Sequence, residues 1–195
     1  MANPTIDISK YQTVADWNKV KAAVSGVMIK ATEGLGYVDP SFASHAKGAK
    51  TAGIPFGFYH FASLNDPADP TGDAVKEAQA FAAACKPYAS TLPYALDLET
   101  NKSSLPRAKV LAWIQAFFGE LQKQGITNYV LYSYTPFLNA NLPVTHGLGN
   151  VRLWLAAYTA VPKLPKGWAK YWMWQYSSKG TIPGITGNVD LNKMG

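Results

Sequence analysis

Short apolar runs rich in β-branched and aromatic residues alternate with helix-like runs along most of the chain, and this alternation restricts the fold more than any other feature. It is typical of βα units built around a parallel sheet. We predict helices at residues 14–23, 40–53, 73–86 and 106–125, and a short turn at 136–142. We predict strands at residues 5–9, 27–31, 56–61, 94–99, 129–133, 152–158, 171–177 and 187–192. The helices fade after residue 134, so the last strands are expected to lack them.

Two α/β architectures accommodate about eight strands and five helices: a closed β/α barrel and an open doubly wound sheet. No glycine-rich phosphate loop follows the first strand, which argues against a nucleotide-binding open sheet. Acidic residues instead recur at or near the C-terminal ends of strands, namely Asp7, Asp97 with Glu99, and Asp190. Residues at that end of the strands converge on one mouth in a barrel. The sequence therefore favours a closed barrel with an acidic mouth.

The segment YALDLET, residues 94–100, places two carboxylates in what otherwise reads as a buried strand. Side chains alternate faces along a strand, so Asp97 and Glu99 share one face. Burying two like charges side by side costs on the order of several kcal/mol each. Such a costly arrangement indicates that the two carboxylates have a function. A pair roughly 5 to 7 Å apart meets the minimum need of glycoside hydrolysis, which is one protonated acid and one ionised carboxylate. Crowding separates the two pKa values, so one group can stay protonated near neutral pH.

A chain of 195 residues, 48% hydrophobic and 15% charged, can bury one sizeable core, and we predict a single domain over residues 1–195. The single cysteine, Cys85, leaves no thiol for an intrachain disulfide and is expected to be a buried hydrophobic residue. The N-terminal segment lacks a charged stretch followed by an apolar one, and no run approaches about 18 apolar residues. We expect synthesis in the cytoplasm without a signal peptide, and no membrane insertion.

The net charge of +6 suggests an acidic polymer as partner. The imbalance is uneven, because Asp190 is the only acid after Glu120. The sequence has no run rich in lysine and arginine, zinc finger or RNA-binding motif, so we expect no nucleic acid partner. An anionic cell-wall polymer is the other candidate, and a surface charge that only aids solubility is the simpler alternative.

A series of short motifs resembles the family-25 glycoside hydrolases, which are lysozymes of the muramidase type and common as bacteriophage endolysins. The motifs are DIS (7–9), IKATEG (29–34), GFYHF (57–61), LDLE (96–99), YS (132–133), LWLAAY (153–158), WQY (174–176) and VDLN (189–192). They span nearly the whole chain in the right order, which makes the combination specific. The resemblance implies a modified, irregular TIM-like β/α barrel that cleaves the β-1,4 bond between N-acetylmuramic acid and N-acetylglucosamine in bacterial peptidoglycan. It also implies action on the cell wall after release from the cell, and we expect a monomer.

The resemblance assigns catalytic roles to four residues. Glu99 is implied to be the general acid, and later the base towards water. Asp97 is implied to orient and polarise the substrate 2-acetamido group, which attacks the anomeric carbon with retention; a covalent aspartyl intermediate is the rival assignment. Asp7 and Asp190 are implied to hydrogen-bond and tune this pair.

Further residues are candidates for contacting the sugar. Lys30 and Glu33 flank a strand end, where they either form a structural ion pair or line the site. Tyr59 is expected to face the interior and His60, its neighbour, to be structural. Aromatic residues near strand ends can offer flat apolar faces to sugar rings, and Gln175 can donate to a hydroxyl. This aromatic set comprises Tyr132, Trp154, Tyr158, Trp174 and Tyr176.

Three other readings of the same residues compete with this one. A metal hydrolase is disfavoured because no H-x-H or H-E-x-x-H pair occurs among the three histidines, so we expect neither metal nor cofactor. The family-18 chitinase pattern D-x-x-D-x-D-x-E fails because Tyr94 and Ala95 precede Asp97. A non-catalytic barrel that binds cell-wall carbohydrate remains the alternative, although binding alone does not require two acids in a desolvated site.

Overall fold

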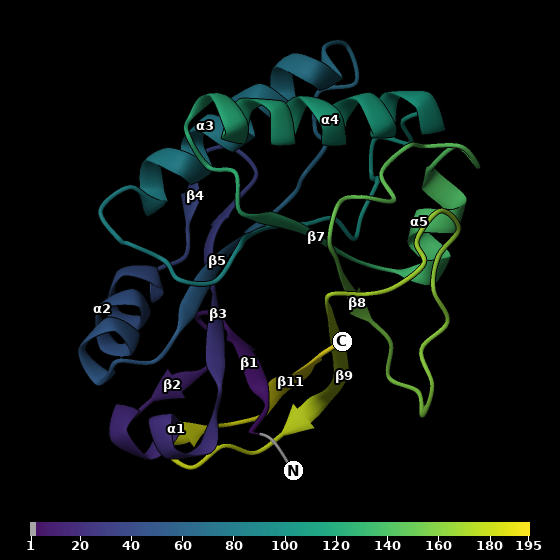
Figure 1. Ribbon diagram of the computed structural model, residues 1–195. Helices are drawn as coiled ribbons and strands as arrows, with labels where there is room; N and C mark the ends of the chain where they lie inside the picture. The colour runs from purple at the N-terminus through teal and green to yellow at the C-terminus, as the bar shows by residue number, and fades with distance from the viewer. Residues whose placement is uncertain (1–2) are drawn as a thin grey trace.

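The computed structural model describes residues 3–195, and eight strands form a closed barrel (Figure 1). They are β1 (Thr5–Ile8), β3 (Gly26–Glu33), β5 (Phe56–Phe61), β6 (Tyr94–Asp97), β7 (Tyr129–Tyr134), β8 (Leu153–Ala156), β9 (Met173–Gly180) and β11 (Val189–Met194). From β1 and β3 through to β9, neighbouring strands are parallel. The last strand, β11, is antiparallel to both β9 and β1, between which it lies. The predicted modified barrel is therefore confirmed.

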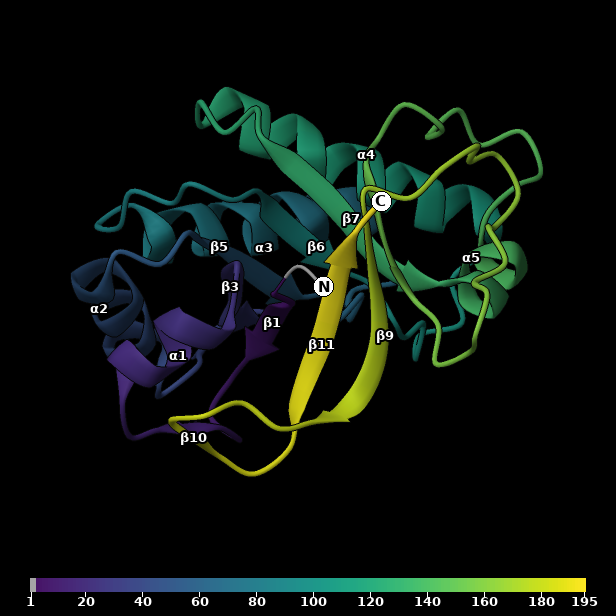
Figure 2. The ribbon, with the colours of Figure 1, turned by 60° about the horizontal axis from the view of Figure 1, so that its bottom comes forward.

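Five helices follow the first strands of the barrel along the chain. They are α1 (Trp17–Ala23), α2 (Phe42–Ala52), α3 (Pro70–Cys85), α4 (Arg107–Lys123) and α5 (Thr135–Asn141). Figure 2 shows β9 and β11 towards the viewer with no helix of the described chain across them. The expectation that the last strands lack helices is thus confirmed.

Three further strands of two residues each were not predicted: β2 (Thr13–Val14), β4 (Tyr37–Val38) and β10 (Ile185–Thr186). A strand this short is too brief to show a periodic pattern. The hairpin that joins β3 to β4 turns at Gly34 and Gly36, whose φ angles are +50° and +85°. Glycine adopts such left-handed conformations without a steric penalty. This hairpin lies at the C-terminal end of β3.

Most element ends differ from those predicted by one to three residues, and two of the differences have a clear local cause. The third helix begins at Pro70 rather than at residue 73, because the Asp69 side chain accepts a hydrogen bond from Gly72 N at 2.9 Å and caps the helix. The strand that carries the acid pair ends at Asp97 rather than at residue 99. Leu98 N still donates to Tyr132 O at 3.0 Å, so the chain keeps its direction beside β7 past the strand end.

The interior of the barrel is divided into an apolar and a polar part. Near the N-terminal ends of the strands it is filled by Met28, Ala95, Val130 and Met173, which are all fully buried. The larger apolar core lies between the outside of the barrel and the helices. Interior positions nearer the C-terminal ends of the strands are mostly polar or aromatic. The barrel interior is thus filled by apolar side chains at one end and carries the potentially reactive side chains at the other.

The alternation along β5 separates two neighbouring residues as expected. Tyr59 faces the barrel interior, where it lines a cavity. His60 faces outward and is fully buried under the helices, with its Nε2 2.7 Å from Glu77 Oε2 and its Nδ1 2.8 Å from Thr32 Oγ1. His60 is therefore a structural residue that ties β5 to α3 and β3. Cys85 is buried and unbonded, and burial raises the pKa of its thiol.

Candidate active site

A cavity of about 200 Å³ opens at the C-terminal mouth of the barrel. All four predicted catalytic acids line it, together with a larger group of predicted sugar-contacting residues. That group consists of Lys30, Tyr59, Tyr132, Trp154 and Gln175. Residues that the sequence analysis did not single out complete the lining: Ile8, Ser9, Tyr11, Gln12 and Phe61. The barrel thus brings together side chains from both ends of the sequence.

The first carboxyl pair in the cavity is Asp97 and Glu99. Asp97 is the last residue of β6 and is 6% exposed, whereas Glu99 lies just past the strand and is partly buried. The two side chains are within hydrogen-bond contact of each other. Two carboxyls can make this contact when they share a proton. The backbone between them is fixed by Ser133 Oγ, which donates to Leu98 O at 2.6 Å.

The surroundings of this pair favour retention of a proton. Burial raises the pKa of Asp97 well above its usual range, and the neighbouring charge of Glu99 raises it further. Burial also raises the pKa of Glu99, a hydrogen bond with Asp97 opposes that rise, and the charge of Asp190 adds to it. Lys30 lowers the pKa of both groups by its positive charge. The pair therefore stays protonated to a higher pH than isolated carboxyls would.

The second carboxyl pair is Asp7 on β1 and Asp190 on β11, which lie directly opposite each other in the antiparallel register. Burial raises the pKa of Asp7 well above its usual range, and the charge of Asp190 adds to the effect. Two amide donors oppose it, because Asn192 Nδ2 and Gln175 Nε2 donate to Asp7 Oδ2 at 2.8 and 3.1 Å. Burial raises the pKa of Asp190, and a hydrogen bond with Asp7 lowers it.

The orientation of these two amides is fixed by their other partners. Gln175 Oε1 accepts hydrogen bonds from the Tyr132 and Tyr158 hydroxyls at 2.9 and 2.8 Å. The Oδ1 atom of Asn192 accepts a hydrogen bond from Trp154 Nε1 at 2.7 Å. Because the Trp154 indole N–H can only donate, Asn192 must turn its oxygen to Trp154 and its NH₂ group to Asp7. Gln175 is oriented in the same way, with its oxygen towards the two tyrosine hydroxyls and its NH₂ group towards Asp7. The sequence analysis missed Asn192, although its position two residues after Asp190 in a strand-like segment was a usable signal.

The aromatic residues predicted to contact the sugar, including Tyr59, lie in three places: the cavity wall, a second pocket and the outside of the barrel. Tyr59, Tyr132 and Trp154 form a mostly buried wall of the cavity, with ring centroids of the last two 4.6 Å apart. Tyr158 is 58% exposed and lines a second pocket of about 500 Å³, which shares Glu99 and Tyr132 with the first. This second pocket lies between the start of α5 and the loop after β8.

Trp174 and Tyr176 do not line either of these pockets. They alternate with Gln175 along β9, so they lie on the other face of the strand. Trp174 Nε1 donates to Ala157 O at 2.7 Å, and Lys193 Nζ lies 4.3 Å from a Trp174 ring centroid. The two aromatic residues therefore pack on the outside of the barrel, where helices are missing.

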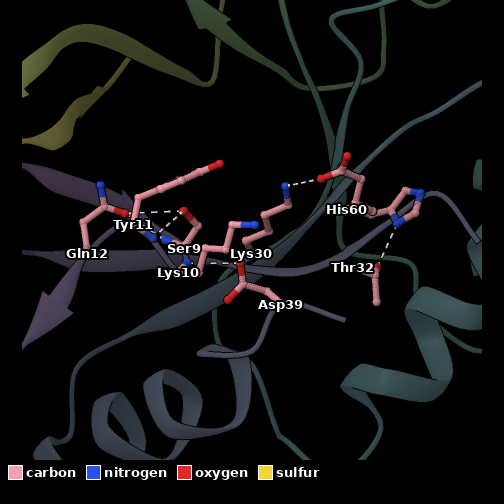
Figure 3. Close-up of polar contacts among 9 residues, drawn as sticks. Ser9, Lys10, Tyr11, Gln12, Lys30, Thr32, Asp39 and His60 are labelled. Carbon is pink, nitrogen blue, oxygen red and sulfur yellow. Dashed lines mark hydrogen bonds and ion pairs between the residues drawn. The ribbon is translucent and has the colours of Figure 1, made fainter. Parts of the chain in front are cut away.

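Lys30 and Glu33 form an ion pair with each other beside the cavity. The Nζ atom of Lys30 lies 2.6 Å from Glu33 Oε2 (Figure 3). Lys30 lines the cavity, and Glu33 is not part of that lining. Lys30 therefore both forms the structural ion pair and lines the site, whereas Glu33 only pairs with the Lys30 ammonium group and does not reach the cavity.

Residues 3–195 contain neither a metal-binding cluster nor a membrane-spanning helix. No group of three or more histidine, cysteine, aspartate or glutamate side chains in that range is arranged to hold a metal ion. None of the helices there is long and apolar enough to cross a membrane. What the mouth of the barrel does supply is paired carboxyls, oriented amides, one ammonium group and aromatic rings.

Comparison with known proteins identifies the family to which the chain belongs. A model described as "Glycosyl hydrolases family 25" matches residues 6–185. Lysozyme M1 of Streptomyces globisporus is 32% identical and the autolytic lysozyme of Clostridium acetobutylicum 35% identical, each over 97% of this chain. The matches cover 66% and 55% of those proteins, so the chain spans between about half and two thirds of their length. The solved structure of the bacterial lysozyme from Streptomyces coelicolor superposes with a TM-score of 0.87 at 30% identity, and covers 100% of this chain and 92% of that one. The chain therefore belongs to family 25 of the glycosyl hydrolases.

Proposed function

We propose that this protein is a peptidoglycan hydrolase of the muramidase type, which cleaves the β-1,4 bond between N-acetylmuramic acid and N-acetylglucosamine. The observation that carries the proposal is the contact between Asp97 and Glu99 at the place where two pockets meet. Family membership and the two lysozymes described above support the same activity. In this proposal the anionic cell-wall polymer is the partner of the positively charged protein.

Glu99 is the proton donor in this proposal. It is the acid that lines both pockets, so a glycan laid across the mouth places the scissile oxygen beside it. Glu99 is also more exposed than Asp97, which allows its carboxyl to reach a bound sugar. The raised pKa of Glu99 keeps the proton available for the leaving oxygen.

The role of Asp97 follows from its place beside Glu99. Asp97 ends β6 and lies deeper in the cavity than Glu99, next to it at the same strand end. We therefore place both acids on one side of the sugar and favour an internal nucleophile over a covalent aspartyl intermediate. The substrate acetamido oxygen attacks the anomeric carbon while Asp97 accepts a hydrogen bond from the acetamido N–H. Glu99 then removes a proton from the water that opens the cyclic intermediate, and the anomeric configuration is retained.

Asp7 and Asp190 serve as fixed charges in the wall of the same cavity. The amides of Gln175 and Asn192 hold Asp7 in place, and Asp190 faces Glu99 closely enough to raise its pKa. Tyr59, Tyr132 and Trp154 supply the apolar surface beside the acids. Together these groups exclude water from one side of the bound sugar.

The test is mass spectrometry of peptidoglycan digested by the purified protein. Products that end in reducing N-acetylmuramic acid support the proposal. Reducing N-acetylglucosamine or freed peptides would show that a different bond is cleaved. Binding to cell walls without any product would support the alternative of a non-catalytic binding barrel. NMR of the first product separates retention from inversion.

A further inference from the structure

The loop that follows β1 is held rigidly beside the catalytic cavity. Ser9 N donates to Gln12 Oε1 at 3.0 Å, and Gln12 N donates to Ser9 O at 3.1 Å. Lys10 N donates to Asp39 Oδ2 at 3.1 Å (Figure 3). The other oxygen of Asp39 accepts from Ser41 N at 2.9 Å. Asp39 is 2% exposed, so a buried carboxylate fixes the backbone of Lys10. The fold therefore fixes the backbone of Lys10 next to Ser9 and Tyr11, which line the cavity.

The ammonium group of Lys10 lies between two tyrosine rings. Its Nζ is 5.3 Å from the ring centroid of Tyr11 and 5.3 Å from that of Tyr37. Cations at this distance are attracted to aromatic rings. The neighbouring Tyr37 side chain raises the pKa of Lys10, so the group stays charged. The side chain is exposed, and it reaches solvent with its charge intact.

A comparison with Lys30 shows what distinguishes this lysine. Lys30 Nζ lies 5.7 Å from the same Tyr37 ring, but it is paired with Glu33 at 2.6 Å. Lys10 takes part in no ion pair within residues 3–195. Its neighbour Tyr11 is 77% exposed and lines the catalytic cavity. The rim of the cavity thus carries one oriented cation whose charge is available to a ligand.

We propose that Lys10, Tyr11 and Tyr37 form a carboxylate-binding site at the rim of the catalytic cavity, which takes a carboxylate carried by the muramic acid residue of the substrate. The proposal rests on the proposed function, since it assumes a peptidoglycan strand in the cavity. In that polymer the lactyl group of muramic acid, or the peptide attached to it, carries carboxylates close to the bond that is cleaved. An exposed ammonium group beside flat aromatic rings suits such a group on a sugar.

The test varies the charge on the enzyme and on the substrate together. Soluble glycan strands that carry stem peptides are compared with the same strands after their carboxyls have been converted to amides. Lys10→Gln is expected to raise KM for the charged strands roughly threefold to fivefold, which is the size of one exposed ion pair. It should leave KM for the amidated strands and kcat for both unchanged. Lys10→Arg should restore KM.

A matched control and a third substrate complete the experiment. Lys86→Gln removes an exposed lysine just after α3, at the opposite end of the barrel, and should change KM for neither strand. In peptide-bearing strands the lactyl carboxyl is bound in the amide link to the peptide, so a KM effect on them assigns a peptide carboxylate. Strands stripped of peptide carry only the lactyl carboxylate, so a KM effect on them assigns the lactyl group. An equal effect of Lys10→Gln on charged and amidated strands, or no effect on any of the three substrates, would overturn the site. Failure of the wild-type protein to cleave any strand would instead refute the proposed function.

Discussion

The two carboxyl pairs in the cavity are built in different ways. Asp97 and Glu99 come from one short segment at the end of β6, and no protein group within residues 3–195 donates to the buried Asp97 Oδ1. Asp7 and Asp190 come from opposite ends of the chain and meet only because β1 pairs with β11. Asp7 Oδ2 receives two amide hydrogen bonds.

This difference teaches which pair can move a proton. A carboxyl whose oxygens are already bonded to fixed amides is held as a local charge, and giving up that charge costs those bonds. Both pairs are in mutual hydrogen-bond contact, so what distinguishes Asp97 and Glu99 is the buried Asp97 Oδ1, which has no donor within residues 3–195 and can bond a ligand with little rearrangement. We therefore assign chemistry to Asp97 and Glu99 and electrostatic support to Asp7 and Asp190.

Replacing Glu99 should have the largest effect. Glu99→Gln keeps the shape of the side chain but removes the proton for the leaving oxygen, so kcat should fall by roughly 10²-fold or more. The matched control is Glu120→Gln near the end of α4, far from the mouth, which should leave kcat unchanged. Turnover is measured on soluble glycan strands, with circular dichroism to verify folding. A folded Glu99→Gln protein with near-normal turnover would show that another group is the acid.

Replacing Asp97 tests the second member of the mobile pair. Asp97→Asn can no longer stabilise the charge that develops on the acetamido group, so kcat should fall by roughly 10²-fold with little change in KM. Strands lacking the N-acetyl group at the cleaved sugar should be poor substrates for the wild-type protein. An inverted anomer as the first product, observed by NMR, would rule out this mechanism.

Replacing a member of the fixed pair should shift a pH profile with a smaller loss of rate. The negative charge of Asp190 raises the pKa of Glu99, and Glu99 must be protonated to act. Asp190→Asn removes that charge, so the pKa of Glu99 falls and the alkaline limb of kcat/KM against pH moves to lower pH. Asp7→Asn should act mainly on Asp97, whose pKa the Asp7 charge raises. Profiles that superpose on the wild-type curve would leave both residues without an electrostatic role.

The smallest expected effect is on stability, and it separates the two pairs directly. The raised pKa of a buried carboxyl means that the folded state loses stability as pH rises through that pKa. A neutral amide removes this loss, so Asp97→Asn should raise the free energy of unfolding by about 1 kcal/mol near neutral pH. The gain should disappear in acid, where the wild-type carboxyl is protonated in both states.

Asp7→Asn should give a smaller gain, because two amide hydrogen bonds already compensate the Asp7 carboxylate. Urea unfolding of both variants near neutral pH and in acid gives the comparison. An equal gain for the two variants would show that the amides do not distinguish the pairs.

The outline of the fold could be predicted because its signals are local. Strand and helix patterns indicated the eight barrel strands, about five helices and the absence of helices after β8, although most element ends differ by one to three residues from those predicted. The gathering of Asp7, Asp97, Glu99 and Asp190 also followed, since strand ends of a barrel meet at one mouth. The roles of these acids stay predictions that the experiments above test.

Other features of the site depend on partners that no local pattern reveals. Trp174 was grouped with Gln175, yet the two lie on opposite faces of β9 and only Gln175 reaches the cavity. The role of Asn192 depends on Trp154 Nε1 and Asp7 Oδ2, which lie on two other strands.

The sequence by itself determined which elements form and which acids stand at strand ends, because backbone preference and side-chain alternation are properties of neighbouring residues. Only the tertiary structure decided that Asp97 touches Glu99, that two amides fix Asp7, and that Lys10 stands between Tyr11 and Tyr37. Burial and hydrogen-bond partners set the charge and mobility of each group, and both arise from residues that are distant in the chain. The local sequence therefore identifies the acids, whereas the closed barrel determines the different surroundings, and so the different proposed roles, of the two pairs.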